Sequence, residues 1–469
     1  MADVQKQSHQ PDFLLYFAVL ALTAIGIVTV YSASTVIALE QGMSAAHFAL
    51  RQLIFGGIGV VLMTVVTFIP YQIFYRYAAK LMIISLFLLF LVLIPGIGHR
   101  ADGSRRWLGP ASLHIQPSEL ALIALILYLA FFFTKKVTII HSTMRVLRPA
   151  LLVTVATASL IFLEPDMGTA FTVAATGFIM LFISGIRLKP VIITFIASIP
   201  VLYGLIEMAK YRSSRLEVYF HPFQHPAHAY QLISGLTGIA RGGLIGTGFD
   251  ASIEKAGYLP IPQADFIFAV FVEEWGLLGA IALLAIFALL VWRGFRIARF
   301  AKDRFGSLLA VGITGMMIVQ AFVNLAAVTW LLPITGIPLP FISYGGTSLI
   351  MMLLASGILL SISRQTLDVA PEADELADVY DVSEVLRERK RLPIDPMYQQ
   401  QKKKKPATVA PIKRNKSTAK SAIHYEKTRK NRDGRASTMQ VTTWRERSMR
   451  YDNRLPNNRK QGSNKNDRT

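Results

Sequence analysis

Long apolar segments, each close to the length needed to cross a lipid bilayer, occupy most of the first 364 residues. Roughly 20 helical residues cross the hydrocarbon core of a bilayer, and within lipid a helix pairs all of its own backbone N–H and C=O groups. The candidate segments are 13–33, 48–69, 78–97, 117–134, 149–163, 168–184, 188–207, 266–292, 307–331 and 343–363. The sequence therefore predicts an all-α, polytopic integral membrane protein with about ten transmembrane helices.

Two neighbouring segments, 149–163 and 168–184, are shorter than the others, and Glu164-Pro165-Asp166 separates them. They are predicted either as two independent spans or as a broken, re-entrant pair. The first interpretation gives ten spans and leaves both termini on the same side of the membrane.

Basic residues mark one face of the predicted bundle. Loops 135–148, 185–189 and 293–306 are rich in lysine and arginine and share this face with the termini. Cytoplasmic loops carry an excess of such residues, so both termini are predicted to be cytoplasmic. The outer face then receives the loops 34–47, 98–116, 208–264 and 332–342.

The charge of the chain is concentrated beyond its apolar part. Although 53% of the residues are hydrophobic, the formal net charge is +20. Residues 365–400 carry nine acidic and four basic side chains, and residues 401–469 carry five acidic and 21 basic ones. Stretches this polar do not bury a core. The chain is therefore divided into a cytoplasmic N-terminus (1–12), a membrane domain (13–363) and a disordered cytoplasmic tail (364–469).

The basic tail has two interpretations. It either lies near the anionic inner leaflet, which attracts basic segments, or binds nucleic acid. No folded nucleic-acid-binding module accompanies it, so the membrane is the predicted partner and nucleic acid is not.

Several classes of chemistry are excluded by what the sequence lacks. It contains no cysteine, which excludes disulfides, thiolate zinc sites, iron–sulfur clusters and a cysteine nucleophile. It also has no Ser-His-Asp arrangement, P-loop or dinucleotide-binding fingerprint. The candidate residues are instead polar groups in the outer half of the bundle.

The loop 98–116 brings Arg105 and Arg106 beside Trp107, and Glu119 follows at the start of the next span. One interpretation is structural, with an interfacial tryptophan and a carboxylate in the first turn of a helix. The other is a cationic lip that receives the headgroup of an anionic lipid, and we favour this one.

Two aspartates lie where the chain enters the membrane from the outer side. Asp166 either caps the following helix or binds a cation or an acceptor sugar. Asp265, which follows the loop 208–264, is either a cap or a general base, because a carboxylate between water and lipid can have a raised pKa. Glu273 and Glu274 follow at roughly 80° and 180° from Asp265 around the helix axis. At least one of these glutamates must therefore pair elsewhere in the bundle.

Four parts of the chain resemble, in the same order, the signature sequences of one family. They are RRWLGPASLHIQPSE, EPDMGTA, the pair YQLISGLTGIARGGLIGTGFD and YLPIPQADFIFAVFVEEWGLLG, and LLPITGIPLPFISYGGTSLI. The chain resembles the SEDS proteins (FtsW, RodA and SpoVE), the polytopic peptidoglycan polymerases of bacteria, over residues 13–363. Lys255 before YLP and the following DFIFAV are more similar to the division branch, FtsW, than to the elongation branch.

The resemblance implies the ten-helix SEDS fold and a peptidoglycan glycosyltransferase that polymerises lipid II, an undecaprenyl-pyrophosphate-linked disaccharide peptide. This reaction occurs at the outer face of the bacterial cytoplasmic membrane, and for the division branch at the septum. The implied partners are a class B penicillin-binding protein, which supplies transpeptidation, and other division proteins. Three alternatives remain open: a lipid II flippase, a noncatalytic scaffold and an elongation-type polymerase.

The resemblance also implies roles for individual residues. Positions that match the family's signatures are Asp265, in the large outer loop, and Arg106, Trp107, Glu119 and Asp166. Asp265 is the predicted general base. The family often has a lysine three residues after the glutamate that matches Glu119, and here that position is Leu122.

The leaving group of this reaction is a lipid pyrophosphate, on which negative charge develops. Arg106, Arg215 or Lys255 would stabilise that charge, as would a bound divalent cation such as Mg²⁺ or Mn²⁺. Ser343 and Tyr344 are predicted to hydrogen-bond a sugar. No other cofactor is expected.

Overall fold

The computed structural model describes residues 9–101, 104–109, 114–139, 143–207, 219–224, 226–255, 259 and 261–366. The described residues belong to the first of two units into which the chain divides, Met1–Arg387. Arg215 and the tail beyond residue 366 lie outside the described residues, so what the sequence predicts of them stays a prediction.

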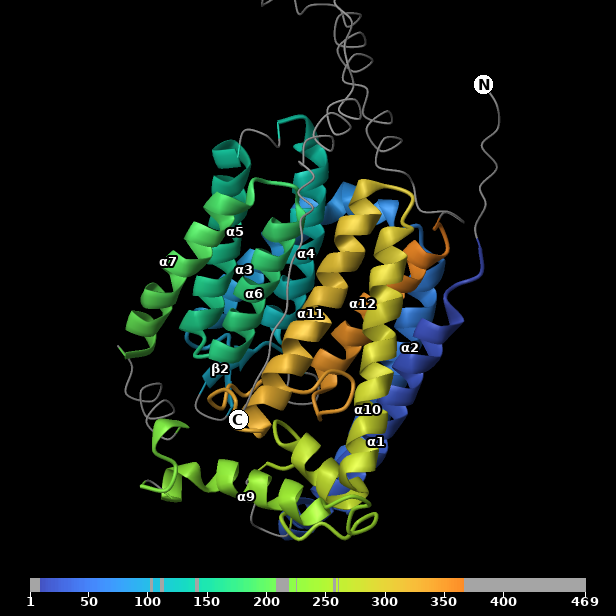
Figure 1. The fold of residues 1–469 in the computed structure, drawn as a ribbon, viewed down its shortest axis with the longest axis vertical. Coiled ribbons are helices and arrows are strands. Elements are labelled where there is room, and N and C mark those ends of the chain that lie inside the picture. The colour runs from blue at the N-terminus through green and yellow to red at the C-terminus, as the bar shows by residue number, and fades with distance from the viewer. Residues whose placement is uncertain are drawn as a thin grey trace, which may run out of the picture. The chain divides into compact units, whose positions relative to one another are not determined.

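Helices form nearly all of the described part of the chain (Figure 1). In chain order they are α1 (Phe13–Glu40), α2 (His47–Phe68), α3 (Gln72–Leu93), α4 (Pro117–Lys135), α5 (Thr143–Leu163), α6 (Met167–Ile183), α7 (Leu188–Glu207), α9 (Pro226–Gly242), α10 (Ile267–Arg299), α11 (Arg304–Val328) and α12 (Gly346–Ser363). A 3-10 helix, Val137–Ile139, follows α4. Two short strands, β1 (His99–Ala101) and β2 (Ser104–Trp107), pair antiparallel in the loop between α3 and α4.

The all-α membrane fold predicted from the sequence is confirmed. Eight of the described helices are long and apolar enough to cross a membrane, and two shorter apolar helices, Met167–Ile183 and Leu188–Pro200, accompany them. The two short segments around Glu164-Pro165-Asp166 form separate helices, α5 and α6, that pack against each other.

Helix α10 is longer than the predicted span and reaches Arg299. Half of the basic loop predicted at 293–306 is therefore the end of this helix, where cations interact favourably with the helix dipole.

Burial divides the helices into an inner and an outer set. In α4, α11 and α12, 72–78% of the most apolar 18 residues are buried, whereas the fraction is 28–33% in α2, α3 and α5. The outer helices expose large apolar side chains such as Ile83 and Phe87 of α3, which suits contact with lipid. Polar groups on the inner helices are consequently shielded from lipid by their neighbours.

One helix of the large outer loop was not predicted from the sequence. Helix α9 lies crosswise at one end of the bundle, next to the first half of α10 (Figure 1). Its amphipathic pattern is short, and the glycines and prolines around it led to the prediction of a continuous loop. The loop 208–264 is therefore partly helical, and α9 helps to build the candidate site.

Candidate active site

Helix α10 is broken near the end that carries Asp265. Gly276 has φ 67° and ψ −170°, values that interrupt the helix. The loop after α9 supplies the missing hydrogen bonds: Thr247 and Gly248 donate to the carbonyl oxygens of Glu273 and Glu274 at 2.9 and 3.1 Å. On the other side of the break, the N–H groups of Leu277 and Leu278 donate to the carbonyl oxygens of residues 243 and 244 at 2.9 and 3.1 Å. The loop and the first half of α10 thus form one hydrogen-bonded unit.

Only glycine fits at the centre of this contact. A Cβ atom added to Gly246 would lie 2.1 Å from the carbonyl oxygen of Glu274, and one added to Gly276 would lie 2.4 Å from the N atom of Gly246. Both glycines also have positive φ, which costs other residues roughly 1–2 kcal/mol. The glycine-rich sequence is therefore required by close backbone approach.

Charged side chains tie the same loop to α10. The carboxylate of Glu273 is fully buried and receives hydrogen bonds from Ser252 Oγ at 2.5 Å and from the N–H of Ile253 at 3.0 Å. Arg241, at the end of α9, lies 3.3 Å from Glu273 and 3.2 Å from Glu254. Burial and the neighbouring Glu273 raise the pKa of Glu254, and Arg241 opposes the rise.

A second group of charges joins the loop to α1. Lys255 is buried, and its Nζ lies 2.5 Å from Asp250, 3.2 Å from Glu274 and 2.9 Å from Ser32 Oγ. Ser32 also donates to Glu274. At least one of Glu273 and Glu274 was predicted to pair away from Asp265. Both do so, since Glu273 pairs with Arg241 and Glu274 with Lys255.

We predict that Lys255→Met destabilises the protein by about 3–5 kcal/mol, because it leaves the buried carboxylate of Glu274 without its cation. The double variant Lys255→Met/Glu274→Gln should recover much of the loss. Thermal unfolding of the purified protein in detergent measures both effects. A substrate-binding role for Lys255 predicts instead that the single variant unfolds like the wild type and loses only activity.

Asp265 lies just before α10, where a side chain of α11 holds its backbone. Asn324 of the inner helix α11 donates through Nδ2 to the carbonyl oxygens of Asp265 and Ile337, both at 2.8 Å. The carboxylate reaches the 333–345 segment, since a Cβ added to Gly336 would lie 3.5 Å from its Oδ2 atom. Asp265 is half-buried, so a carboxylate in a fixed position retains access from outside the bundle.

Ser343 and Tyr344 belong to the same assembly. Ser343 Oγ donates to the carbonyl oxygen of Ala264 and accepts from the N–H of Leu339, both at 2.8 Å. The N–H of Tyr344 donates to the carbonyl oxygen of Gln263 at 2.8 Å. The contacts of Ser343 hold the 333–345 segment against the residues before Asp265. Burial raises the pKa of the Tyr344 phenol, and the nearby Arg51 opposes the rise.

A second cluster forms around Asp166, at the start of α6. One carboxylate oxygen caps this helix by accepting from the N–H of Thr169 at 3.1 Å. The other accepts from Gln116 Nε2 at 3.1 Å and lies 3.8 Å from Arg106 Nη1. The structural interpretation of Asp166 as a helix cap is thus confirmed, and the same carboxylate also faces Arg106 of the loop 98–116. Its predicted role in binding a cation or an acceptor sugar stays a prediction.

Arg106 and Glu119 complete this cluster. Arg106 is 29% exposed, and its buried Nε has no hydrogen-bond partner among the described residues. Glu119 is buried, and its Oε2 has no hydrogen-bond partner in the described part of the chain. Leu122, where the family often has lysine, is fully buried and gives Glu119 no counterion.

Glu164 sits beside the same cluster, in the turn between α5 and α6. It is fully buried, and neither carboxylate oxygen has a hydrogen-bond partner within the described ranges. Burial and the charge of Asp166 raise its pKa to about 9, although Arg106 lowers it. Glu164 therefore holds a proton at neutral pH.

This proton gives stability a predictable pH dependence. Between the ordinary pKa of 4.5 and about 9, the folded protein binds one proton that the unfolded chain releases. The free energy of unfolding should therefore fall by about 1.4 kcal/mol per pH unit across this window. Glu164→Gln should remove this contribution and be the more stable protein at pH 8. Unfolding temperatures of both proteins from pH 5 to 9 test this, and parallel curves would contradict it.

Residues 335–337 connect the two clusters. A Cβ added to Gly168, two residues after Asp166, would lie 2.7 Å from the carbonyl oxygen of Thr335, and Gly336 is the residue that faces Asp265. The structure thus gathers Arg106, Glu119 and Asp166 on one side of this segment and Asp265 on the other. Trp107 follows Arg106 on β2, and its ring lies 6.1 Å from that of His114.

Sequence reasoning missed two features of the site: the support of Asp265 by Asn324, and the break of α10 at Gly276. Asn324 carried a signal, since a buried amide on an apolar helix needs partners. Among the residues that the structure describes, no group of three or more His, Asp or Glu side chains could hold a metal ion.

Comparison with known proteins places this arrangement in one family. Residues 13–368 match the family model described as "Cell cycle protein" (FtsW, RodA, SpoVE). The chain is 42% identical over 355 residues to stage V sporulation protein E of Bacillus subtilis, covering 76% of this chain and 97% of that protein. It is 41% identical over 353 residues to the probable peptidoglycan glycosyltransferase FtsW of Trichlorobacter lovleyi, covering 75% and 93%.

Solved structures show the same fold. A chain from the structure of a peptidoglycan synthase complex that coordinates polymerization and crosslinking matches with a TM-score of 0.64 and 26% identity, covering 76% of this chain and 99% of that one. The rod shape determining protein RodA of Thermus thermophilus matches with a TM-score of 0.57 and 27% identity, covering 76% and 98%. The chain therefore belongs to the FtsW/RodA/SpoVE (SEDS) family of polytopic membrane proteins and to its peptidoglycan glycosyltransferases.

Proposed function

We propose that this protein polymerises lipid II into glycan strands at the outer face of the cytoplasmic membrane, with Asp265 as the general base. The observation that supports this most is the position of Asp265, a half-buried carboxylate at one end of the bundle, against Gly336. Asn324 holds the backbone of Asp265 in this position. A base that is fixed and yet accessible can accept a proton from a bound hydroxyl group.

The proposed reaction requires one base and one site for negative charge. The acceptor sugar hydroxyl gives its proton to the Asp265 carboxylate while its oxygen forms a bond to the anomeric carbon of the donor. The bond from that carbon to the lipid pyrophosphate breaks, and the pyrophosphate leaves with the bonding electrons. In-line displacement with a single base inverts the anomeric centre, as a β-linkage made from an α-linked donor requires.

Arg106 is the described cation best suited to the pyrophosphate. It is partly exposed, and among the described residues it has one carboxylate partner at 3.8 Å and an Nε without a hydrogen-bond partner. Lys255 is engaged by Asp250 and Glu274, which favours a structural role, and Arg215 remains a candidate from the sequence. Mg²⁺ or Mn²⁺ bound with the pyrophosphate itself would add to the charge stabilisation.

The proposed orientation puts both termini in the cytoplasm. It rests on the basic residues at the end of α10 and in the loops near 135–148 and 185–189, which the positive-inside rule assigns to the cytoplasmic side. Asp265, at the other end of α10, is then at the outer face. The identity to FtsW proteins supports a role in septal synthesis with a class B penicillin-binding protein and other division proteins, whereas a RodA-type role in elongation is the alternative.

Incubation of the purified full chain and its penicillin-binding partner with labelled lipid II tests the proposal. Glycan strands resolved by gel electrophoresis are the expected product. Transfer of lipid II between leaflets with no strands formed would instead identify a flippase. Repeating the assay with EDTA and then with added Mg²⁺ or Mn²⁺ measures the requirement for a cation.

A further inference from the structure

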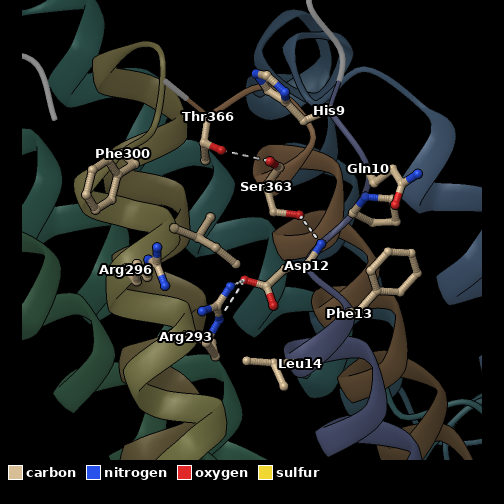
Figure 2. Close-up of a pocket in the computed structure, with 12 residues that line it drawn as sticks. His9, Gln10, Asp12, Phe13, Leu14, Arg293, Arg296, Phe300, Ser363 and Thr366 are labelled. Carbon is tan, nitrogen blue, oxygen red and sulfur yellow. Dashed lines mark hydrogen bonds and ion pairs between the residues drawn. The ribbon is translucent and has the colours of Figure 1, made fainter. Parts of the chain in front are cut away.

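A polar cavity lies at the end of α10 opposite to Asp265. Its volume is about 570 Å³, within the range of roughly 300–1,000 Å³ of small-molecule sites. The start of α1, the last turns of α10 and the end of α12 surround it (Figure 2). The lining residues include His9, Gln10, Asp12, Phe13, Arg293 and Arg296.

The two arginines of the cavity differ in their surroundings. Arg293 is paired with Asp12, with Nε 2.8 Å from Oδ2. The other carboxylate oxygen of Asp12 caps α1 by accepting from the N–H of Leu15 at 3.0 Å. Arg296 forms no ion pair among the described residues, and its guanidinium lies about 6 Å from the ring centres of Trp292 and Phe300. The cavity wall thus carries one uncompensated positive charge.

The start of α1 adds a second feature that favours an anion. The first N–H groups of a helix lack intrahelical partners, and the helix dipole is positive at this end. Phe13 and Leu14, the first two residues of α1, line the cavity. Asp12 already accepts from the N–H of Leu15, which leaves the N–H groups of Phe13 and Leu14, and an anion there would meet these and the guanidinium of Arg296.

The surface beside the cavity is apolar and faces outward. Phe13 and Phe17 of α1 are 52% and 61% exposed, and Trp292 and Phe295 of α10 are 55% and 43% exposed. The cavity lies where α1 begins and α12 ends, which is the level expected for lipid headgroups, with acyl chains alongside the helices. A ligand with an anionic head and apolar tails matches both surfaces.

We propose that this cavity binds the phosphodiester headgroup of an anionic glycerophospholipid, with its acyl chains against the exposed aromatic side chains of α1 and α10. A single phosphodiester carries one negative charge and matches the one unpaired arginine. The proposal does not depend on polymerisation, and its test measures lipid binding alone.

Native mass spectrometry of the full chain, released from nanodiscs of equal parts phosphatidylglycerol and phosphatidylcholine, tests this. The wild type should retain phosphatidylglycerol in preference to phosphatidylcholine. Arg296→Gln should lower this preference about fivefold, the effect of one basic residue at an anionic surface. Arg299→Gln is the matched control, because Arg299 lies on the same helix and does not line the cavity. Arg296→Lys, which keeps the charge, should retain most of the preference.

Three results would overturn the proposal. In the first, Arg296→Gln and Arg299→Gln retain phosphatidylglycerol equally. In the second, millimolar glycerol 3-phosphate displaces the lipid completely, which identifies a site for a soluble phosphate. In the third, a chain ending at Thr366 retains several times more phosphatidylglycerol than the full chain, which identifies the acidic residues 367–386 as the occupant.

Discussion

Asp265→Asn is expected to lower the rate of glycan polymerisation on the order of 10²–10⁴-fold, the usual contribution of a general base. The amide keeps the size of the side chain and cannot accept the proton of the acceptor hydroxyl. The contacts of Asn324, Ser343 and Tyr344 in this region are to backbone atoms of residues 263–265, so they remain in the variant. The fold should therefore be retained, and the loss should appear in the rate.

Asp250→Asn is the matched control for this variant. It removes a negative charge from the loop 208–264, which precedes Asp265. Asparagine tolerates the positive φ of 62° at this position. Lys255 keeps Glu274 and Ser32 as partners, so the control should polymerise lipid II within a few-fold of wild type. An Asp265→Asn protein that polymerises at the control's rate would refute the assignment of the base.

Gly246→Ala is expected to destabilise the protein by about 2–5 kcal/mol and to abolish polymerisation. Alanine must adopt a left-handed backbone conformation here, which costs roughly 1–2 kcal/mol. Its methyl group must also displace the carbonyl oxygen of Glu274, which lies 2.1 Å from its position. Overpacking of this kind typically costs about 1–3 kcal/mol. Because the loop completes the hydrogen bonds of α10, the shift would be transmitted to the first half of this helix and to Asp265.

Two other glycines separate the causes of this effect. Gly243 also has positive φ, but its Cβ would meet no atom within 4 Å, so Gly243→Ala should show only the smaller cost of the backbone. Gly57 lies inside α2 with open space around it, and Gly57→Ala should leave the unfolding temperature unchanged or slightly raised. Equal unfolding temperatures for Gly246→Ala and Gly243→Ala would contradict the proposed close contact.

The membrane helices could be predicted from the sequence because lipid imposes a simple requirement. Each span must be apolar and about 20 residues long, and the segments at 117–134 and 343–363 agree with α4 and α12 to within one to three residues at each end. The ends of α1 and α10 were placed too early because both helices continue beyond their apolar part, to Glu40 and Arg299.

The break in α10 could not be predicted, because an isolated glycine in a helical pattern is compatible with an unbroken helix. Its cause is a tertiary contact: the loop after α9 takes over the hydrogen bonds around Gly276. The same contact explains why Glu273 and Glu274 occur together on an apolar helix. Their partners, Arg241 at the end of α9 and Lys255 in the following loop, are not placed by sequence spacing alone.

The candidate site was predictable as a set of residues and only partly as an arrangement. The resemblance to the family identifies Arg106, Asp166 and Asp265 as candidate site residues. Their relation through residues 335–337 depends on close packing at Gly168 and Gly336, which no local pattern encodes. The deviation at Leu122 was visible in the sequence, and in the structure it corresponds to a buried Glu119 with one unpartnered oxygen.

The most direct test of the account is polymerisation in proteoliposomes in which the orientation of the protein is known and labelled lipid II is confined to one leaflet. Glycan strands are expected when lipid II lies in the leaflet at the Asp265 end of α10, and none are expected with Asp265→Asn. Lipid II that crosses to the other leaflet without forming strands, or strands formed only from the leaflet at the Arg296 end, would contradict it.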